Sequence, residues 1–206
     1  MRELTVPQDI LAAVHGEPML AWAAQGGLRG ARVWVHGDAV AAAAPQISRR
    51  DRIVARGSLE HVAHLVCEVL RERGPSYRLF GPVEQVEAVA ALLDMPVLGR
   101  FSWFDTRTPP PPQPGEDAVV PVGDEEVSAL LAEAAPGSWA APGVPGVQRW
   151  LGIRDAGVAV SVACEAWSAP TVGFVAGVGT AVDHRGRGLA RAVCAVLVRE
   201  LVEQRG

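Results

Sequence analysis

One segment of this 206-residue sequence combines residue types and spacing that could bind a ligand. It reads Arg185-Gly186-Arg187-Gly188, with an apolar stretch before it and an amphipathic stretch after it. If the second stretch is a helix, its first N–H groups have no intrahelical acceptor, and its dipole adds about half a positive charge at that end. Glycines let a ligand approach the backbone without an intervening Cβ. The segment therefore predicts a phosphate or pyrophosphate site.

The residues around this turn predict the elements that position it. Residues 172–182 are uncharged and mostly apolar, which is typical of a strand, and residues from Leu189 onward repeat apolar side chains at helical spacing. Upstream we expect a strand over 119–122, a helix capped by Asp124, a Pro/Gly-rich loop over 136–146, and strands over 149–153 and 158–167. The C-terminal half therefore reads strand, helix, loop, three strands, helix.

The N-terminal half also alternates strands and helices, which is an α/β pattern. We expect a helix from Pro7 that is interrupted near Gly16, and a hairpin over 32–43. A strand over 52–55 precedes a helix capped by Ser58. A strand over 77–80, a helix around 86–93 and a last strand over 97–104 complete the predicted order.

A proline-rich stretch over 108–117 predicts the boundary between the halves, because four consecutive prolines cannot join a helix or an interior strand. We therefore expect a lobe over 1–107, an extended spacer, and a second lobe over 118–206.

Composition excludes several classes of function. All 19 basic side chains are arginine, so no lysine is present to form a Schiff base or a Walker-type phosphate loop. The net charge of −4 argues against a nucleic-acid partner. The N-terminus lacks a signal peptide, and the longest uncharged run, residues 166–182, is too short and too broken to span a membrane. Three scattered cysteines, with no metal-ligand pair, indicate a cytoplasmic protein without a metal site.

The turn resembles the signature of the GCN5-related N-acetyltransferases, Arg/Gln-x-x-Gly-x-Gly/Ala, which in this chain is matched by Arg185, Gly188 and Ala190. Arginine, glycine and alanine are so frequent in this sequence that a match to the signature is weak evidence by itself. The predicted strand before it and the predicted helix after it make the match significant. The resemblance implies an α/β, acyl-CoA N-acyltransferase-like mixed sheet flanked by helices, in two lobes. It also implies acetyl-CoA as co-substrate.

The resemblance assigns roles to the residues of the turn and of the strand before it. Backbone amides of the turn are expected to hold the pyrophosphate of acetyl-CoA, and Thr180, Ala181 and Val182 to pair with its pantetheine arm. An N–H group near Ala181 or Val182 is the expected oxyanion donor. The cofactor residues of the turn and first helical turn are then Arg185, Gly186, Arg187, Gly188, Leu189, Ala190 and Arg191.

The chain departs from the family pattern after the last helix. Relatives continue with further strands and a helix that carries a tyrosine acid, whereas the single tyrosine here, Tyr77, lies in the other half. An unpaired strand edge favours self-association, so a homodimer is one expectation. The N-terminal half from Arg52 onward has the order of the second half of the same fold. We interpret it as a degenerate copy without cofactor, as in tandem members.

Catalytic candidates are less well marked. Glu165 is the best carboxylate for a general base, although an exposed strand-end residue is the alternative reading. Asp183 and His184 either face solvent or position the turn. Trp139, in the Pro/Gly-rich loop, either closes over the acceptor or anchors the loop. Glu133 could face the acceptor or the solvent, while the apolar surroundings of Cys164 and Cys194 predict core positions.

The sequence thus predicts direct acetyl transfer from acetyl-CoA to an unidentified amine, carried by a small molecule or a peptide. The alternative is a non-catalytic CoA-binding or interaction protein.

Overall fold

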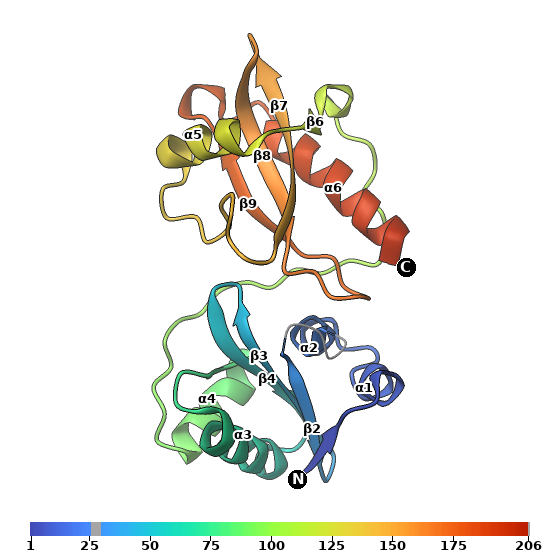
Figure 1. The fold of residues 1–206 in the computed structure, drawn as a ribbon, viewed down its shortest axis with the longest axis vertical. Helices are drawn as coiled ribbons and strands as arrows, with labels where there is room; N and C mark the ends of the chain where they lie inside the picture. Colours follow the sequence, from blue (N-terminus) through green and yellow to red (C-terminus); the bar gives the residue numbers. More distant parts are fainter. Residues whose placement is uncertain (26–29, 206) are drawn as a thin grey trace. The chain divides into compact units, whose positions relative to one another are not determined.

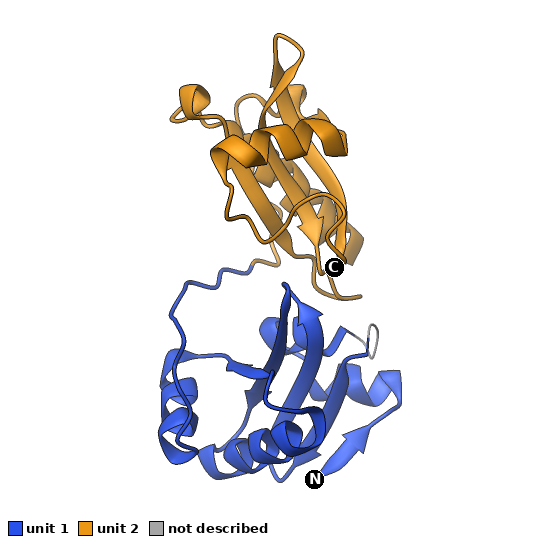
Figure 2. Ribbon diagram, turned by 60° about the vertical axis from the view of Figure 1, so that its left-hand side comes forward, with its two compact units in different colours: residues 1–105 blue, residues 106–206 orange. Residues whose placement is uncertain are grey.

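The computed structural model describes residues 1–25 and 30–205, and the chain divides into two compact units, Met1–Asp105 and Thr106–Gly206 (Figures 1 and 2). Each unit has its own sheet and its own helices. Within the described ranges, no helix combines the length and apolar character needed to cross a bilayer.

Unit 1 is built on a mixed five-stranded sheet in which spatial order follows chain order. The strands are β1 (Arg2–Leu4), β2 (Arg32–His36), β3 (Ala39–Ile47), β4 (Arg50–Arg56) and β5 (Arg78–Phe80). The first four pair antiparallel, and β5 lies parallel to β4. A parallel pair needs a crossover connection, which α3 (Leu59–Arg73) supplies. In Figure 1, α1 (Pro7–Ala13) and α2 (Pro18–Ala24) lie on one side of this sheet, and α3 and α4 (Val83–Leu92) on the other.

The core of unit 1 forms because α3 has an apolar stripe. Its buried members Val62, Leu65, Val66 and Val69 pack against sheet residues that include Trp34 and Ile53. Each fully buried aliphatic side chain contributes about 1.5–3 kcal/mol, so this contact fixes α3 on the sheet.

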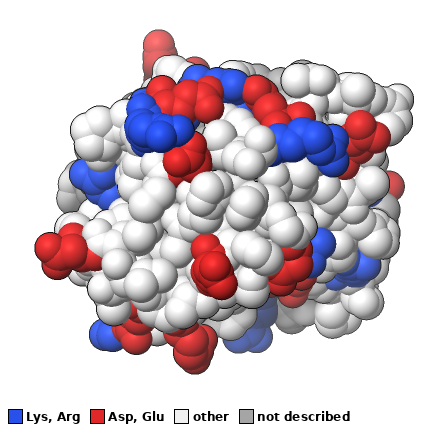
Figure 3. Space-filling view, turned by 90° about the horizontal axis from the view of Figure 1, so that it is seen from below, with Lys and Arg blue, Asp and Glu red and all other residues white. Residues whose placement is uncertain are grey.

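Three arginines of unit 1, Arg32, Arg71 and Arg100, form ion pairs with carboxylates. Arg32 contacts both Glu3 and Glu72, and Arg100 contacts Glu87. On the face drawn in Figure 3, acidic and basic side chains lie next to each other and form no patch of one sign.

The predicted strand over 97–104 is wrong, because these residues form no strand. Phe101 instead stacks on Phe80 at 5.0 Å between ring centroids, and the Trp103 ring lies 5.4 Å from that of Trp22. The neighbouring β5 has only three residues, which offers a short ladder, and ring packing takes the place of strand pairing. The three-residue strand β1 was not predicted, since it is too short to show a period.

Unit 2 contains a four-stranded antiparallel sheet with the order β6-β7-β8-β9. The strands are β6 (Val120–Pro121), β7 (Val147–Asp155), β8 (Val158–Ala166) and β9 (Val175–Thr180). Helix α6 (Leu189–Arg205) covers one face, and α5 (Asp124–Ala134) covers the other (Figure 1). The α6 face buries Val193, Leu197 and Leu201 against Leu151 and Ile153.

The predicted capping residues differ in detail from the structure. Gly123, not Asp124, holds the N-cap position of α5, and its N–H donates to the Glu126 carboxylate at 3.2 Å. Ser58 is the N-cap of α3, but its hydroxyl bonds Asp38 and not the helix backbone. At α5 the cap is therefore the Glu126 carboxylate, whereas at α3 Asp38 takes the hydroxyl that would otherwise cap the helix.

Both units share one order of elements: a strand, a helical segment, three antiparallel strands and a helix. Unit 1 has α1 and α2 where unit 2 has α5, and it adds β5 and α4 after the common part. Of the order predicted from Arg52 onward, β4, α3, β5 and α4 are present and the last strand is not.

Part of the proline-rich segment is bound to unit 2. Arg199 of α6 donates to the Pro110 carbonyl and holds the Glu116 carboxylate in a bidentate pair, with both N–O distances 2.9 Å. The short 3-10 turn Glu116–Ala118 follows. Pro110 and Glu116 were expected to belong to an extended spacer, but they contact α6 instead.

Three histidines of unit 1 meet where β2 ends and α3 begins. The rings of His36 and His64 stack with 4.1 Å between centroids, and His61 lies edge-on to His36 at 5.1 Å. His61 Nδ1 also lies 2.6 Å from Asp38 Oδ1 and 3.1 Å from Ser58 Oγ. The serine and the carboxylate share one ring nitrogen, so this is a helix-end network and not a catalytic triad, which uses both nitrogens.

This cluster predicts acid sensitivity of unit 1. Burial, together with the His64 and His61 imidazoles and the N-terminal amine, lowers the pKa of His36 below its ordinary value of 6.5, while Glu60 acts in the opposite direction. The unfolded chain then binds more protons, so stability is complete above about pH 6.5 and falls as the pH decreases through that value. We expect the thermal midpoint to fall between pH 7.5 and 5.5, and to fall less in His36→Gln. The exposed His15→Gln is the control, and equal pH dependence in all three proteins would contradict the assignment.

Candidate cofactor-binding site

The glycine-arginine turn lies between β9 and α6, as predicted. A short 3-10 turn, Val182–His184, follows β9, and residues 185–188 lead into the helix. Gly186 and Gly188 have φ angles of 76° and 79°, which favour glycine, and a Cβ built on either would meet nothing within 4 Å. The space beside both glycines is therefore open.

Unpaired donors collect at this turn. The bond from Ala192 N–H to Gly188 O, at 3.1 Å, is at the start of α6, so Leu189, Ala190 and Arg191 have no intrahelical acceptor. They lie at the positive end of a 17-residue helix, beside the exposed residues 185–188. Such an end is suited to an anionic group.

Two of the three arginines are used to hold the turn. Arg185 donates through Nε to the Thr180 carbonyl at 3.1 Å and through Nη2 to the Ala134 carbonyl, at the end of α5, at 3.2 Å. Arg187 donates to the Asp183 carbonyl at 3.0 Å. Within the described part of the chain, Arg191 forms no hydrogen bond or ion pair. It is therefore the arginine whose guanidinium is available to a phosphate.

His184 is tied to the β7–β8 hairpin. Its Nε2 lies 2.9 Å from Asp155 Oδ2, and this hydrogen bond lowers the pKa of the Asp155 carboxyl. Of the two roles considered for His184, its surroundings favour positioning of the turn.

A β-bulge in β9 was not predicted. Val162 pairs with Gly179 and Cys164 with Ala176, which leaves one extra residue on β9. Gly177 takes this position with φ of 61°, and a Cβ there would lie 2.4 Å from Cη2 of Trp150. The sequence signal was available, because glycine inside an apolar strand is typical of a bulge.

β9 is the edge strand of the described sheet. Ala181 N–H donates to Val160 O at 2.9 Å, so by antiparallel geometry Thr180, paired with Ser161, directs its backbone groups to the open side. This edge can pair with an extended amide chain. Because the Ala181 N–H is occupied, Val182 is the better of the two expected oxyanion donors.

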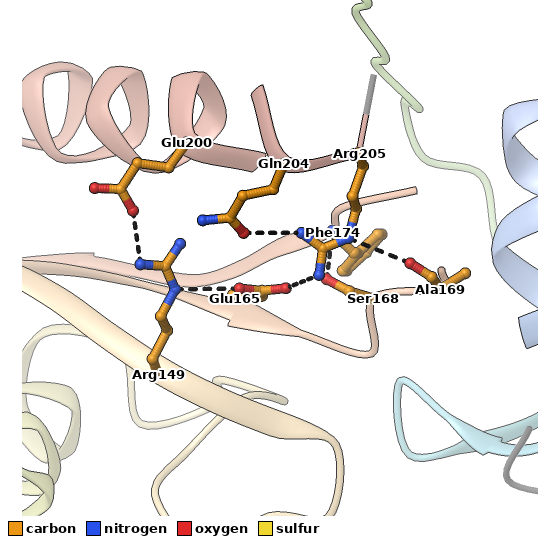
Figure 4. Close-up of polar contacts among 8 residues, drawn as sticks. All are labelled: Arg149, Glu165, Ser168, Ala169, Phe174, Glu200, Gln204 and Arg205. Carbon is orange, nitrogen blue, oxygen red and sulfur yellow. Dashed lines mark hydrogen bonds and ion pairs between the residues drawn. The ribbon is translucent and has the colours of Figure 1, made fainter. Parts of the chain in front are cut away.

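Glu165 is not the exposed strand-end residue that the alternative reading proposed. It is 3% exposed and lies between Arg149, 3.1 Å from one oxygen, and Arg205, which donates to the other (Figure 4). Arg149 also donates to Glu200 at 2.6 Å. Arg205 is at the far end of α6, which is about 25 Å long, from the cofactor turn. Both oxygens are engaged by guanidinium groups, which favours a structural role.

The remaining candidates lie on α5, in the loop after it and in β8. Trp139 is 44% exposed in the loop after α5, and Glu133 is exposed on α5 itself. Cys164 is buried, as predicted for a core residue, and burial raises the pKa of its thiol to about 12. Over residues 1–25 and 30–205, no group of three or more His, Cys, Asp or Glu side chains is arranged to hold a metal ion.

Replacing Gly177 tests the bulge. We expect Gly177→Ala to lower the free energy of unfolding by about 2 kcal/mol, because alanine is strained at positive φ and its Cβ would collide with Trp150. Urea unfolding measures the change. Gly137→Ala, where a Cβ meets nothing within 4 Å, is the control and should stay within about 0.5 kcal/mol.

Replacing Glu165 tests its structural role. We expect Glu165→Ala to cost about 2–3 kcal/mol, because Arg149 and Arg205 lose a partner in a partly buried place. Glu133→Ala, on the exposed surface of α5, should change stability by less than about 0.5 kcal/mol. An E165A protein that unfolds at the same urea concentration as the parent would show that the network contributes nothing.

No protein-family model and no curated protein sequence matches the chain. Solved structures similar to it include a GCN5-related N-acetyltransferase from Kribbella flavida, at 21% identity and a TM-score of 0.53, over 93% of this chain and 83% of that one. A GCN5-related N-acetyltransferase-like protein from Streptococcus suis is 14% identical, over 97% and 85%, with a TM-score of 0.43.

A protein from Novosphingobium aromaticivorans that is named as a member of the GCN5-related N-acetyltransferase (GNAT) family is 28% identical, with a TM-score of 0.38. The similarity covers 52% of this chain, which spans 44% of the length of that protein. The Kribbella likeness, which extends over both units, supports the argument about fold. It agrees with the mixed sheet flanked by helices that the sequence predicted. The protein therefore has the acyl-CoA N-acyltransferase-like α/β fold of the GCN5-related N-acetyltransferases.

Proposed function

We propose that unit 2 binds acetyl-CoA and transfers its acetyl group directly to an amine. The observation that carries this proposal is the open glycine turn at the positive end of α6, directly beside the edge strand β9. An anion site and a strand edge at one place suit a ligand that joins a pyrophosphate to an extended amide arm.

Each part of the site has a role in this proposal. The N–H groups of residues 186–190 and the Arg191 side chain bind the pyrophosphate. The outward N–H of Thr180 donates to the pantetheine arm, while the Thr180 carbonyl keeps its bond from Arg185. Arg185 and Arg187 hold the turn in shape. The Val182 N–H stabilises the oxyanion that forms when the amine attacks the thioester carbonyl.

The transfer exchanges one bond for another at the acetyl carbon. The amine nitrogen bonds to that carbon, the carbon–sulfur bond breaks, and the thiolate leaves with the proton that the nitrogen loses. β9 offers no titratable side chain, and Glu165 is engaged by two arginines, so we assign no general base. The acceptor is an amine of a small molecule or peptide, with Trp139 as a candidate contact.

We further propose that unit 1 is a copy that takes no cofactor, because its own side chains occupy the equivalent places. At the start of α3, the Asp38 carboxylate accepts the Ser58 N–H at 2.9 Å and the Ser58 hydroxyl at 2.8 Å. At β4, Gln85 of α4 donates to the Ala55 carbonyl at 3.0 Å. An internal carboxylate thus occupies the helix start of unit 1, which is open in unit 2. The strand carbonyl is engaged in both units, by Gln85 at Ala55 and by Arg185 at Thr180.

A non-catalytic CoA-binding protein is the second candidate. One observation favours it: the single tyrosine, Tyr77, is buried in unit 1, where Arg73 donates to its hydroxyl at 3.1 Å. Unit 2 therefore holds no tyrosine that could protonate the leaving thiolate.

Calorimetric titration with acetyl-CoA tests binding, and we expect one site per chain. Release of free thiol with a panel of amines then separates the candidates, since only an enzyme consumes the thioester faster than buffer. Absence of binding would reject both functions, and two sites per chain would reject the assignment of unit 1.

Replacing Arg191 tests the site itself. We expect Arg191→Ala to weaken CoA binding about tenfold, because a charge-assisted contact to phosphate is lost, and to reduce the salt dependence of binding. The exposed Arg2→Ala in unit 1 is the control and should leave the dissociation constant unchanged. Equal affinities of the two variants would place the phosphate elsewhere.

A further inference from the structure

The β7–β8 hairpin reaches the cofactor turn through one side-chain contact. Asp155, the last residue of β7, accepts from His184, the last residue of the 3-10 turn, across 2.9 Å. The carboxylate is 64% exposed and the imidazole 21% exposed, so the ring is enclosed while its partner stands at the surface.

The proton of this contact can be placed on one nitrogen. Among the described residues, His184 Nδ1 is buried without a hydrogen-bond partner. A proton there would be a buried, unsatisfied donor, which is unfavourable. A carboxylate accepts, so the proton of this contact lies on Nε2 and His184 donates to Asp155.

The turn depends on such polar contacts for its shape. Residues 185–188 are exposed and bury no apolar side chain, and Arg185 and Arg187 are themselves exposed. His184 directly precedes Arg185, so the orientation of its ring constrains the backbone that enters the turn. A turn that is already ordered loses less conformational entropy when a ligand binds.

We propose that Asp155 is a positioning residue for the cofactor turn. It acts through His184 to hold the backbone donors in place and does not touch the ligand. This inference rests on the proposed binding of CoA by unit 2. By its charge alone a carboxylate would disfavour a nearby phosphate, so its benefit must come from the hydrogen bond.

Two substitutions at Asp155 have different expected effects. Asp155→Asn keeps an oxygen that accepts from Nε2 and removes the charge, whereas Asp155→Ala removes both. Asp183→Ala is the matched control, because this neighbouring carboxylate is exposed and makes no side-chain contact within the described ranges.

The experiment compares CoA with pantetheine, which lacks the phosphates, for the parent and the three variants. We expect Asp155→Ala to weaken CoA about tenfold and to leave pantetheine unchanged, because only the phosphate donors are displaced. Asp155→Asn should bind CoA as tightly as the parent or more tightly, and Asp183→Ala should match the parent. The hydrogen-bonded amides of Arg185 and Ala192, on either side of the turn, should exchange faster without ligand in Asp155→Ala alone, which gives a second readout.

The possible failures are distinguishable. A parent that does not bind CoA rejects the proposed function. A parent that binds, with Asp155→Ala equally tight or equally weakened for pantetheine, overturns the positioning role. A loss of CoA affinity in Asp155→Asn as large as in Asp155→Ala would show that the charge itself matters, which also overturns it.

Discussion

The burial of α6 against the sheet of unit 2 is the constraint on which the candidate site depends. Val193, Leu197 and Leu201 pack onto the face that holds Leu151 and Ile153. This contact fixes the helix axis, so its N-terminal end must emerge beside the last residues of β9. The donors at that end are therefore placed by apolar packing several turns away, and the turn itself needs no core of its own.

In this protein arginine alone takes the structural roles that lysine and arginine share in other proteins. With no lysine, every long cationic side chain is a planar fork that can bind two acceptors at once. Arg185 joins β9 to α5, Arg199 binds the proline-rich segment to α6, and Glu165 lies between two guanidinium groups. Arginines of unit 2 are thus mainly structural connectors, and the exposed Arg191 stands apart from this use.

The two units have one order of elements but different contacts at the turn before the helix. In both, a carboxylate from the hairpin before the third antiparallel strand reaches the following strand–helix turn. Asp38 bonds the backbone N–H at the start of α3, whereas Asp155 bonds the His184 side chain and leaves the backbone donors of α6 unused. The difference is one of side-chain partners, because the strand order is the same.

The sequence by itself determined which segments have helical or strand spacing of apolar residues, the strand–turn–helix around Arg185 and the mixed α/β fold. The positions of glycines and the spacing of apolar residues are local signals, so these features can be predicted without knowing the tertiary contacts. Tertiary structure decided what each polar group meets. Glu165 became a buried partner of two arginines, Arg185 turned back to the Thr180 carbonyl, and residues 97–104 packed as rings instead of pairing as a strand. In these contacts the two partners lie 5 to 40 residues apart in the sequence, and only folding brings them together.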